Sequence, residues 1–402
     1  MTPVAGARRR GVKPAPQVSA AAVSTPEGGQ RAGTAGRDAG LVVFLCGDVM
    51  TGRGIDQILP HPGSPELREP AVTDARTYVT LAEHANGPVP MPADVTWPWG
   101  DALAVLDEFA PDVRLINLET SITDDGEFAS GKAVHYRMHP NNIACLSASR
   151  PDACAIANNH ILDFGYRGLA DTLRALNDAG IRAAGAGLTV GEAERAVVVA
   201  CGRAKRVVVA ACGMESSGIP RSWAASHNRP GVAFVADLSD RSAMAVAARV
   251  LAQKRPGDVT IVSVHWGSNW GYEVSAAQVW FAHRLIDAGV DIVHGHSSHH
   301  PRPIELYRDK LILYGCGDAL DDYEGITGYE QFRPNLRLMY FASVDNGCVG
   351  LQMVPMRMRR LRLERVAHDH AEWLRGTLDQ ISRPFKTRVG ETTDGVFSAN
   401  PA

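Results

Sequence analysis

Long hydrophobic runs are missing from this sequence of 402 residues, and so is a net charge of either sign. No stretch of about 18 consecutive apolar residues occurs, so no membrane-spanning helix is expected. The 41 basic and 44 acidic side chains leave a formal charge of -3. A balance this even provides no basic surface for nucleic acid and no polybasic face for an anionic membrane. We therefore expect a chain that spans no membrane and binds no nucleic acid.

Closely spaced cysteine pairs are missing as well. The seven cysteines include no Cys-x-x-Cys motif, and most of them lie in apolar runs, where a thiol behaves as a small hydrophobic side chain. An odd number of scattered cysteines is typical of a reducing compartment rather than of a disulfide framework. The cysteine pattern therefore predicts a cytoplasmic protein.

Residues 1–40 lack the apolar side chains that a folded core requires. They contain no Leu, Ile or aromatic residue and are rich in Ala, Gly and Pro. Such a segment cannot bury enough surface to offset the entropy of ordering, so we expect a disordered N-terminal leader. The run Arg8-Arg9-Arg10 resembles part of a twin-arginine export signal, but no apolar stretch follows it before Leu41, as that signal requires. The disordered leader is therefore the favoured interpretation.

From Leu41 onward, short β-branched apolar runs alternate with segments of helical period. Buried strands are predicted at 41–46, 113–116, 153–157, 197–200, 207–211, 259–264, 290–293 and 311–314. Helices are predicted between them at about 101–109, 166–178 and 275–287. Strands that alternate with helices are typical of βαβ crossovers and of a largely buried sheet. The fold class predicted from this pattern is α/β.

The last quarter of the chain carries a different pattern. Two apolar runs at 336–344 and 349–354 flank Asp345-Asn346-Gly347, which is a turn sequence typical of a β-hairpin. Residues 368–381 predict a polar helix. We therefore expect a C-terminal β-hairpin followed by a helix.

The expected domain organisation follows from these boundaries. After the leader, residues 41–356 form the main domain, and residues 357–402 form a C-terminal extension with a helix. Residues 61–99 are rich in proline and too irregular to build a core, so they are expected to lie as an insertion over one rim.

Polar side chains follow the predicted strands at the points where the strands end. In open α/β sheets, ligands bind beyond the carboxyl ends of the strands. Six of the 14 histidines lie within residues 265–300, an enrichment that composition alone does not explain. Five strand ends carry side chains that can bind metal, in the segments Gly47-Asp48, Asn117-Leu118-Glu119, Asn158-Asn159-His160, His265-Trp266-Gly267 and Gly295-His296-Ser297-Ser298-His299-His300.

This set of donors predicts metal ions at one edge of the sheet. Imidazole is the commonest transition-metal ligand in proteins, and carboxylates add negative charge and can bridge two ions. One Asp, one Glu, one Asn amide and several His contain too many oxygen donors for a closed structural zinc site. The expected cofactors are therefore two divalent metal ions, such as manganese, iron or zinc.

The ordered motifs GD, NLE, NNHxxDxG, HWG and GHxxH resemble the CapA family, the poly-γ-glutamate capsule proteins. That family is similar in turn to the calcineurin-like binuclear metallophosphatases. The matching blocks extend from Leu41 to Asp318. The resemblance implies a four-layer αββα sandwich of the metallophosphatase type. It also implies a metal-dependent hydrolase that cleaves a phosphoester or a γ-glutamyl-like amide bond, with a role in polyglutamate or capsule synthesis.

The resemblance implies roles for eight residues of this sequence. His160 resembles the catalytic histidine, and Asp163 resembles the carboxylate that holds an imidazole in one tautomer. The position of Asp163 before a predicted helix also suits an N-cap, so that alternative stays open. Six metal ligands are implied: Asp48 and His299 for a first metal, Glu119 as the bridge, and Asn159, His265 and His296 for a second metal.

This chain departs from the family pattern around the first metal. Met50 stands where metallophosphatases usually have a histidine. The usual GHHPH is GHSSHH here, so Ser297 replaces one histidine and His300 is additional. Gly315-Cys316-Gly317-Asp318 stands in place of a glycine-asparagine turn. Asp318 and His300 are the two candidates to supply the missing ligand.

The mechanism that the resemblance implies uses a hydroxide held between two metal ions at neutral pH. It attacks phosphorus or an acyl carbon while His160 protonates the leaving group. The expected substrate is a small molecule or a polyanion, and the oligomeric state is left open. Two other functions also stay open: a non-catalytic accessory or binding protein of polymer synthesis, and a tailoring enzyme for a small specialised metabolite.

Four tryptophans lie in predicted loops near the proposed rim. Trp97, Trp99, Trp266 and Trp270 either line a substrate cleft or pack into the core, and the sequence favours neither alternative.

Overall fold

The computed structural model of the chain describes residues 40–202, 205–392 and 395–402. The predicted leader at 1–40 therefore lies outside the described residues, except for Gly40. None of the helices in the described ranges combines the length and hydrophobicity that a bilayer crossing requires.

The first sheet is built around β1 (Leu41–Val49), whose apolar, β-branched residues are almost all buried. Three strands follow it in parallel on one side, each paired with the one before: β2 (Val113–Leu118), β5 (Ala153–Ala155) and β6 (Arg182–Ala184). Because these strands run in one direction, their carboxyl ends meet at one edge of the sheet.

On its other side β1 pairs with the antiparallel strand β17 (Leu336–Asp345). A hairpin joins β17 to β18 (Cys348–Met358), with Asn346 and Gly347 both at positive φ, 48° and 84°. Two such residues in succession form the tight turn that the Asp-Asn-Gly sequence predicts. The sheet continues through β21 (Phe397–Pro401) and β20 (Thr387–Glu391), two strands that the sequence analysis did not predict.

The second sheet has a parallel centre and antiparallel edges. The strands predicted at 197–200 and 207–211 are confirmed: β8 (Val197–Ala200) pairs antiparallel with β9 (Arg206–Met214). The opposite edge strand, β14 (Ile304–Tyr307), pairs antiparallel with β15. The parallel strands are, in order, β9 (Arg206–Met214), β12 (Val259–His265), β13 (Ile292–His296) and β15 (Lys310–Leu313).

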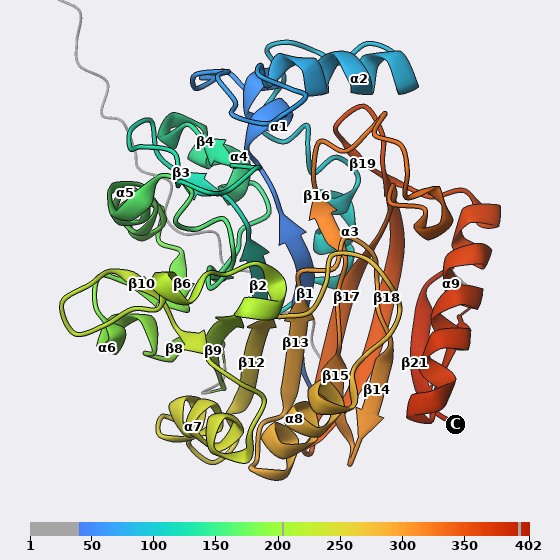
Figure 1. The fold of residues 1–402 in the computed structure, drawn as a ribbon. Helices are drawn as coiled ribbons and strands as arrows, with labels where there is room; N and C mark the ends of the chain where they lie inside the picture. The colour runs from blue at the N-terminus through green and yellow to red at the C-terminus, as the bar shows by residue number, and fades with distance from the viewer. Residues whose placement is uncertain (1–39, 203–204, 393–394) are drawn as a thin grey trace, which may run out of the picture. The chain divides into compact units, whose positions relative to one another are not determined.

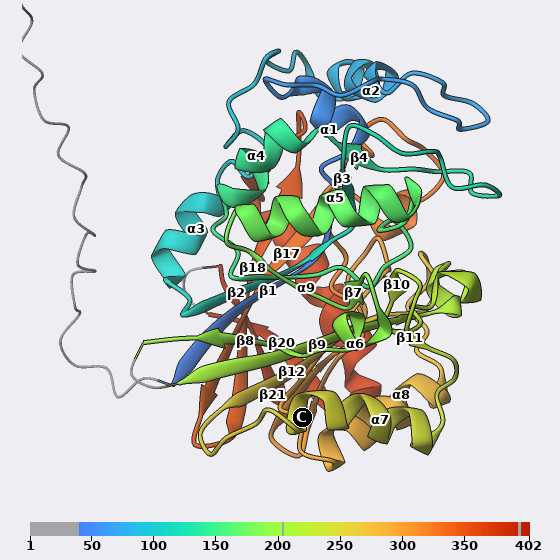
Figure 2. The same ribbon diagram turned by 90° about the vertical axis from the view of Figure 1, so that its left-hand side faces the viewer.

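The two sheets face each other across an apolar core. Leu45 and Leu115 of the first sheet belong to the same buried cluster as Val209 and Ile261 of the second. Helices cover both outer faces, as Figures 1 and 2 show. They are α3 (Ala102–Phe109), α4 (Ile143–Ser147) and α5 (Gly165–Asp178) on the first sheet, and α7 (Asp240–Leu251) and α8 (Ala276–Asp287) on the second.

The α/β class predicted from the sequence is confirmed by this arrangement. The predicted C-terminal helix is α9 (His368–Ser382). Its buried residues Ala371, Leu374 and Leu378 recur at helical spacing and join the core between the sheets. Figure 1 shows α9 beside β21.

Residues 61–99 are more regular than their proline content suggests. The prolines flank α2 (Arg76–Asn86) without entering it, so the helix keeps its backbone hydrogen bonds. Tyr78, Val79 and Ala82 form its buried face. The expectation that this segment builds no core is therefore wrong, because Val79, Ala82 and Trp99 belong to the apolar cluster on the outer face of the first sheet.

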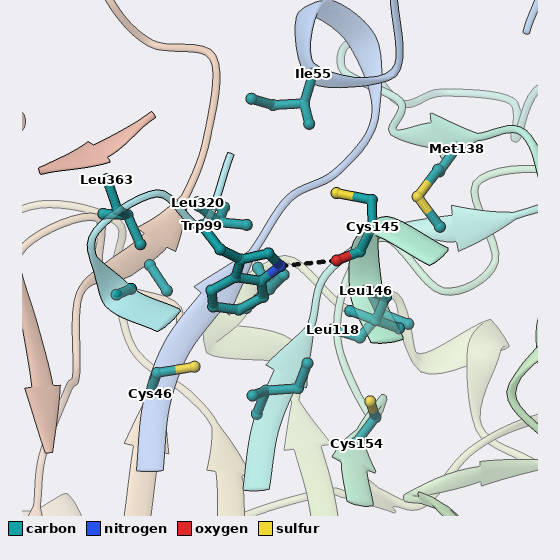
Figure 3. Close-up of a cluster of buried hydrophobic side chains, with 14 of the residues drawn as sticks. Cys46, Ile55, Trp99, Leu118, Met138, Cys145, Leu146, Cys154, Leu320 and Leu363 are labelled. Atoms are coloured by element: carbon teal, nitrogen blue, oxygen red, sulfur yellow. Dashed lines mark hydrogen bonds between the residues drawn. The ribbon is translucent and has the colours of Figure 1, made fainter. Parts of the chain in front are cut away.

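Trp99 anchors the segment 61–99 to the first sheet through burial and one hydrogen bond. Its ring is 1% exposed, and its Nε1 donates a hydrogen bond of 2.8 Å to the carbonyl oxygen of Cys145 in α4. Figure 3 shows the ring surrounded by Cys46, Leu146 and Leu320. The indole therefore joins the segment to both β1 and α4.

Replacing Trp99 by phenylalanine is expected to lower the free energy of unfolding by about 1–3 kcal/mol, because it leaves the buried Cys145 carbonyl without a donor. Denaturant unfolding measures the change. Trp97→Phe is the matched control, since Trp97 is only half-buried and its Nε1 donates to the Arg360 carbonyl at 3.0 Å. An equal loss in both variants would contradict the role of burial.

Candidate metal centre

Asp48 lies where β1 gains a short parallel neighbour, β16 (Asp318–Leu320), and it stands opposite Asp318 in that pairing. The Asp48 N–H donates to the Gly317 carbonyl oxygen at 3.0 Å. Glycine is required at position 47, because a Cβ there would lie 1.6 Å from that same oxygen. The close approach of the two backbones thus places two buried carboxylates side by side.

The second sheet supplies two imidazoles from neighbouring strand ends. His265 is the last residue of β12 and stands opposite His296, the last residue of β13. Their Nδ1 atoms are 2.7 Å apart, and the Nε2 of His265 lies 2.8 Å from Oδ1 of Asn159. Burial lowers the pKa of both rings well below its ordinary value. Both imidazoles are therefore neutral at pH 7, which is the form that binds metal.

A hydroxyl group from the interior of β12 orients the second of these rings. Ser263 Oγ lies 2.8 Å from Nε2 of His296 and 3.0 Å from Nδ1 of His294. His294 in turn lies 2.9 Å from the Cys46 carbonyl oxygen. These contacts leave Nδ1 of His296 as the atom that faces the carboxylates, and they give His294 a structural role.

Glu119 follows β2 directly and is 2% exposed. Its Oε1 lies 3.7 Å from Nε2 of His160 and 3.7 Å from Nε2 of His265. Its Oε2 has no hydrogen-bond partner within the described ranges. Burial, reinforced by the charge of Asp48, raises the pKa of Glu119 well above its ordinary value. The charge of Lys132 opposes this shift but does not reverse it.

His299 and Asp318 form a close pair on the other side of Asp48. The Nδ1 of His299 lies 2.9 Å from Oδ1 of Asp318. Burial by itself would lower the pKa of His299, but the Asp318 carboxylate outweighs it and the pKa is raised. The second oxygen of Asp318, Oδ2, has no hydrogen-bond partner in the described part of the chain.

Two groups of three potential ligands share Asp48. Within each group the donor atoms lie within 4.8 Å of one another. Burial, together with the charge of Asp318, raises the pKa of Asp48 from 3.8 to about 7. Buried carboxylates this close together repel one another unless a positive charge lies between them. The unpartnered oxygens of Glu119 and Asp318 are the kind of ligand that hard divalent ions bind. The groups are Asp48 with His265 and His296, and Asp48 with His299 and Asp318.

His300 does not contribute to either group. Its Nε2 accepts a hydrogen bond from the Gly271 N–H at 3.0 Å, and its Nδ1 lies 3.0 Å from the Pro301 carbonyl oxygen. The ring stacks on Phe332 with centroids 4.5 Å apart. Of the two candidates for the missing ligand of the first metal, only Asp318 lies with the other donors.

His160 is held from behind by a carboxylate and an amine. Its Nδ1 lies 2.6 Å from Oδ2 of Asp163 and 2.9 Å from Nζ of Lys132, and Lys132 also forms an ion pair with Asp163. Burial lowers the pKa of His160 to about 4, and the Lys132 charge adds to the shift, although Asp163 opposes it. The imidazole is therefore neutral at pH 7, with Nε2 directed toward Glu119.

The alternative role of Asp163 as a helix N-cap is wrong. The N-cap residue of α5 is Phe164, and no side chain caps that helix. Asp163 instead accepts a hydrogen bond of 2.7 Å from the Tyr136 N–H and contacts His160 and Lys132. Burial by itself would raise the pKa of Asp163, but the contacts with His160 and Lys132 outweigh it, and the pKa is lowered.

Sequence reasoning missed Lys132. It is an isolated lysine in a polar loop between β3 (Ser121–Ile122) and β4 (Arg137–Met138), with no motif around it. Its side chain is 18% exposed, and its amine contacts the Asn159 carbonyl oxygen as well as Asp163 and His160. Nothing in the one-dimensional pattern marks it, because the contact depends on how the loop folds back over the strand ends.

A cleft of about 340 Å³ opens over these residues. Lys132 and Arg53 are its basic lining residues, and both are paired: Arg53 contacts Asp322 and lies 2.9 Å from Glu69. Five aromatic side chains and four residues of the candidate centre also line it. They are Tyr78, Tyr136, Trp270, Tyr323 and Tyr329, together with Glu119, Asn159, His160 and His299.

Among the four tryptophans in question, only Trp270 lines this cleft. Its ring stacks on Tyr329, with centroids 3.9 Å apart and planes 6° from parallel. Trp99 and Trp266 are each 1% exposed and pack in the core. The cleft therefore has one flat aromatic wall beside the candidate metal ligands.

Comparison with known proteins places this chain among capsule synthesis proteins. The family model described as "Bacterial capsule synthesis protein PGA_cap" matches residues 42–323. A probable polyglutamine synthesis accessory protein of Mycobacterium tuberculosis (strain H37Rv) is 57% identical over 366 residues, which cover 90% of this chain and 96% of that protein.

Two further relatives carry the CapA name. The PGA biosynthesis protein CapA of Bacillus subtilis (strain 168) is 27% identical over 241 residues, which cover 60% of each chain. The capsule biosynthesis protein CapA of Bacillus anthracis is 23% identical over 228 residues, which cover 57% of this chain and 53% of that one. The resemblance read from the motifs is confirmed, and this chain belongs to the bacterial capsule synthesis protein family PGA_cap.

Proposed function

We propose that this protein is a metal-dependent hydrolase of the CapA type that acts in polyglutamate or capsule synthesis. Its substrate carries a phosphoester or a γ-glutamyl-like amide bond. The observation that carries the proposal is the pair of buried ligand groups that share Asp48, with unpartnered carboxylate oxygens on Glu119 and Asp318 beside them. A fully buried carboxylate cluster is costly to maintain without cations.

The proposed centre holds two divalent ions, manganese, iron or zinc. Asp48 belongs to both ligand groups and would therefore serve both ions, whereas the motif comparison assigned it to the first metal alone. Glu119, whose Oε1 lies 3.7 Å from Nε2 of His265, would be the bridging ligand, as the motif comparison implies. The remaining ligands are His299 and Asp318 for one ion, and Asn159, His265 and His296 for the other.

We extend the proposal to the finer fold type and to the location. Two facing sheets with helices outside them, and donors gathered at the strand ends, support a four-layer αββα sandwich of the metallophosphatase type. The seven cysteines are all free, which supports the cytoplasmic location predicted from the sequence.

When bound, the ions supply an activated water molecule and positive charge that stabilises the transition state. His160 is placed to protonate the leaving group, because its Nε2 faces Glu119 at the base of the cleft. Two groups at Nδ1 influence which ring nitrogen carries the proton: the Asp163 carboxylate at 2.6 Å accepts only, and the Lys132 amine at 2.9 Å donates, which favours the proton on Nε2. Lys132 is therefore the proposed positioning residue for the tautomer with the proton on Nε2, and Asp163 holds the Lys132 amine through their ion pair.

The direct test measures turnover of the purified chain on a panel of phosphoesters and γ-glutamyl amides with added Mn²⁺. We expect hydrolysis of at least one class, complete loss after chelation, and recovery when Mn²⁺ is restored. Full turnover after chelation would contradict the proposal.

One observation favours a second candidate function. The relative from M. tuberculosis is named as an accessory protein, and this chain has Met50 and Ser297 where the compared families have histidines. A non-catalytic accessory protein would bind two ions yet cleave no compound of the panel. If both ions are bound but none of the phosphoesters or γ-glutamyl amides is hydrolysed, the second candidate is favoured.

The role of Asp318 gives a separate prediction. Asp318→Asn is expected to reduce the metal content from two ions per chain to one, because Asp318 belongs to only one ligand group. Elemental analysis measures the ratio. His300→Gln is the control and is expected to keep two ions, since His300 contacts Gly271 and Pro301 instead. The reverse pattern would make His300 the compensating ligand.

A further inference from the structure

A second cleft, of about 590 Å³, adjoins the loop that follows β12. The loop lines this cleft through Gly267 and Ser268, and it lines the first cleft through Asn269 and Trp270. The first turn of α8, the segment at Arg302 and the chain after α9 complete the walls. The second cleft therefore lies outside the proposed metal centre but shares a loop with it.

Arg302 brings to this cleft a positive charge that forms no ion pair with any residue the structure describes. It is 3% exposed, and its Nη2 donates to the carbonyl oxygen and to Oγ of Ser268, both at 2.8 Å. Its Nη1 donates to the Glu273 carbonyl oxygen at 3.3 Å, and its Nε has no partner within the described residues. Burial lowers the pKa of Arg302. Neutral acceptors alone do not balance a buried charge.

Gln278 brings a second free donor. It is 8% exposed, and its Oε1 accepts hydrogen bonds of 3.1 Å from the N–H and the Oγ of Ser275. These contacts form the capping box at the start of α8. The amide Nε2 of Gln278 has no partner in the part of the chain that the structure describes.

The two donors converge beside Gly267. A Cβ at this position would lie 3.1 Å from Nη1 of Arg302 and 3.1 Å from Nε2 of Gln278. The two nitrogens therefore lie on the same side of Gly267, no more than about 6 Å apart, and glycine places no side chain between them. An acceptor atom in the cleft between them would accept from Nε2 of Gln278 and from Nη1 of Arg302, whose other contact is the Glu273 carbonyl oxygen at 3.3 Å. This position lies at the amino end of a helix, where negative charge is favoured.

We propose that this cleft is an oxyanion-binding site, in which Arg302 and Gln278 hold a carboxylate or phosphate oxygen beside Gly267. Glu273 is the acidic residue that lines the cleft; its side chain is exposed, and no hydrogen bond or ion pair among the described residues directs it to the buried donors. A bound anion steadies the loop whose Asn269 Nδ2 lies 2.9 Å from Nε2 of His299. The site is thereby linked to the proposed metal centre.

Gln278→Glu is the decisive variant. Glutamate keeps the acceptor oxygens of the capping box, so α8 retains its cap, while the free donor becomes a negative charge beside Arg302. Ala277→Glu is the matched control, because it adds the same charge to the same helical turn at an exposed position outside the cleft. Thermal unfolding verifies that both variants fold.

The binding measurement is calorimetric titration of the full chain with inorganic phosphate and, separately, with acetate, at constant ionic strength. All proteins carry Asp48→Asn, so that anions bound at the proposed metal centre do not contribute. We expect one site for at least one of the two anions. Gln278→Glu should weaken it at least about tenfold, since a hydrogen bond to a charged group is lost, and Ala277→Glu should leave it within about twofold.

The failure of this proposal is distinguishable from failure of the proposed hydrolase. If neither anion binds in the Asp48→Asn background, or if Gln278→Glu binds as tightly as Ala277→Glu, the cleft holds no oxyanion site and the donors bind only water. Neither result bears on metal-dependent turnover, which the substrate panel measures independently.

Discussion

Asp48→Asn is expected to release both metal ions and to abolish turnover. The reason is that Asp48 is the one residue common to the two ligand groups. An amide also lacks the negative charge that binds a hard divalent ion. Elemental analysis of the purified variant and turnover with added Mn²⁺ measure the effect. Asp56→Asn is the control: Asp56 is a buried aspartate that accepts hydrogen bonds from Gly63 and Asn142, so its loss should reduce stability but keep both ions.

Without metal, Asp48→Asn is also expected to change how the stability of the fold depends on pH. Burial and the charge of Asp318 raise the pKa of Asp48 to about 7 in the folded chain. A carboxyl group whose pKa is raised on folding stabilises the fold below its unfolded pKa, and this contribution is lost as the pH rises through the folded pKa. The difference in Tm between Asp48→Asn and the parent should therefore grow in favour of the variant between about pH 4 and pH 7.

The change with pH is the diagnostic quantity here, because the asparagine loses one acceptor for the Asn117 and Ser297 donors at every pH. Thermal unfolding of the chelated proteins across this range measures it. With saturating Mn²⁺ the order should reverse, since the parent alone gains stability by binding the ions. A Tm difference that stays constant with pH would show that Asp48 ionises normally.

His160→Gln is expected to lower kcat by about 10²–10⁴-fold, the usual contribution of a general acid, while metal content stays at two ions per chain. His160 faces the cleft through Nε2, and glutamine cannot transfer a proton. Steady-state kinetics on the substrate found in the panel, with elemental analysis alongside, measure both quantities. Loss of metal together with activity would instead make His160 a ligand.

Lys132 should act through His160 rather than on the substrate. Lys132 is one of the groups that lower the pKa of His160, so Lys132→Met is expected to move the corresponding limb of the pH–rate profile to higher pH. A structural role alone would lower kcat without moving the profile. Lys132→Arg keeps the charge and is expected to leave the limb close to its original position.

Most of the fold could be predicted because it is encoded locally. The buried runs that form β1, β2 and β12 are continuous and β-branched, and the Asn346-Gly347 turn has a geometry that few other sequences adopt. The strands β20 and β21 were missed because the pairing of β21 with β18, which joins them to the sheet, depends on tertiary contacts. The helix α7 is an exception, because its buried residues Ala243, Val246, Ala247 and Val250 recur at helical spacing and Ser239 caps it, so the local signals were present and were missed.

The candidate site was predictable to the extent that strand ends determine it. Once parallel pairing places His265 opposite His296, the two rings must be neighbours, and the motif order anticipates this. Asp318 could only be offered as an alternative to His300, because the backbone approach of Gly317 to Asp48 decides between them. Lys132 could not be predicted at all, since a loop without a motif carries it to Asp163.

The most direct test of the account is the number of metal ions per chain. The purified protein, reconstituted with Mn²⁺ and freed of excess metal, is analysed by elemental mass spectrometry against a measured protein concentration. The account predicts two ions for the parent chain and none for Asp48→Asn. A parent chain that retains no metal under these conditions would contradict it, because the buried carboxylates of Asp48, Glu119 and Asp318 would then have to be held by some other means.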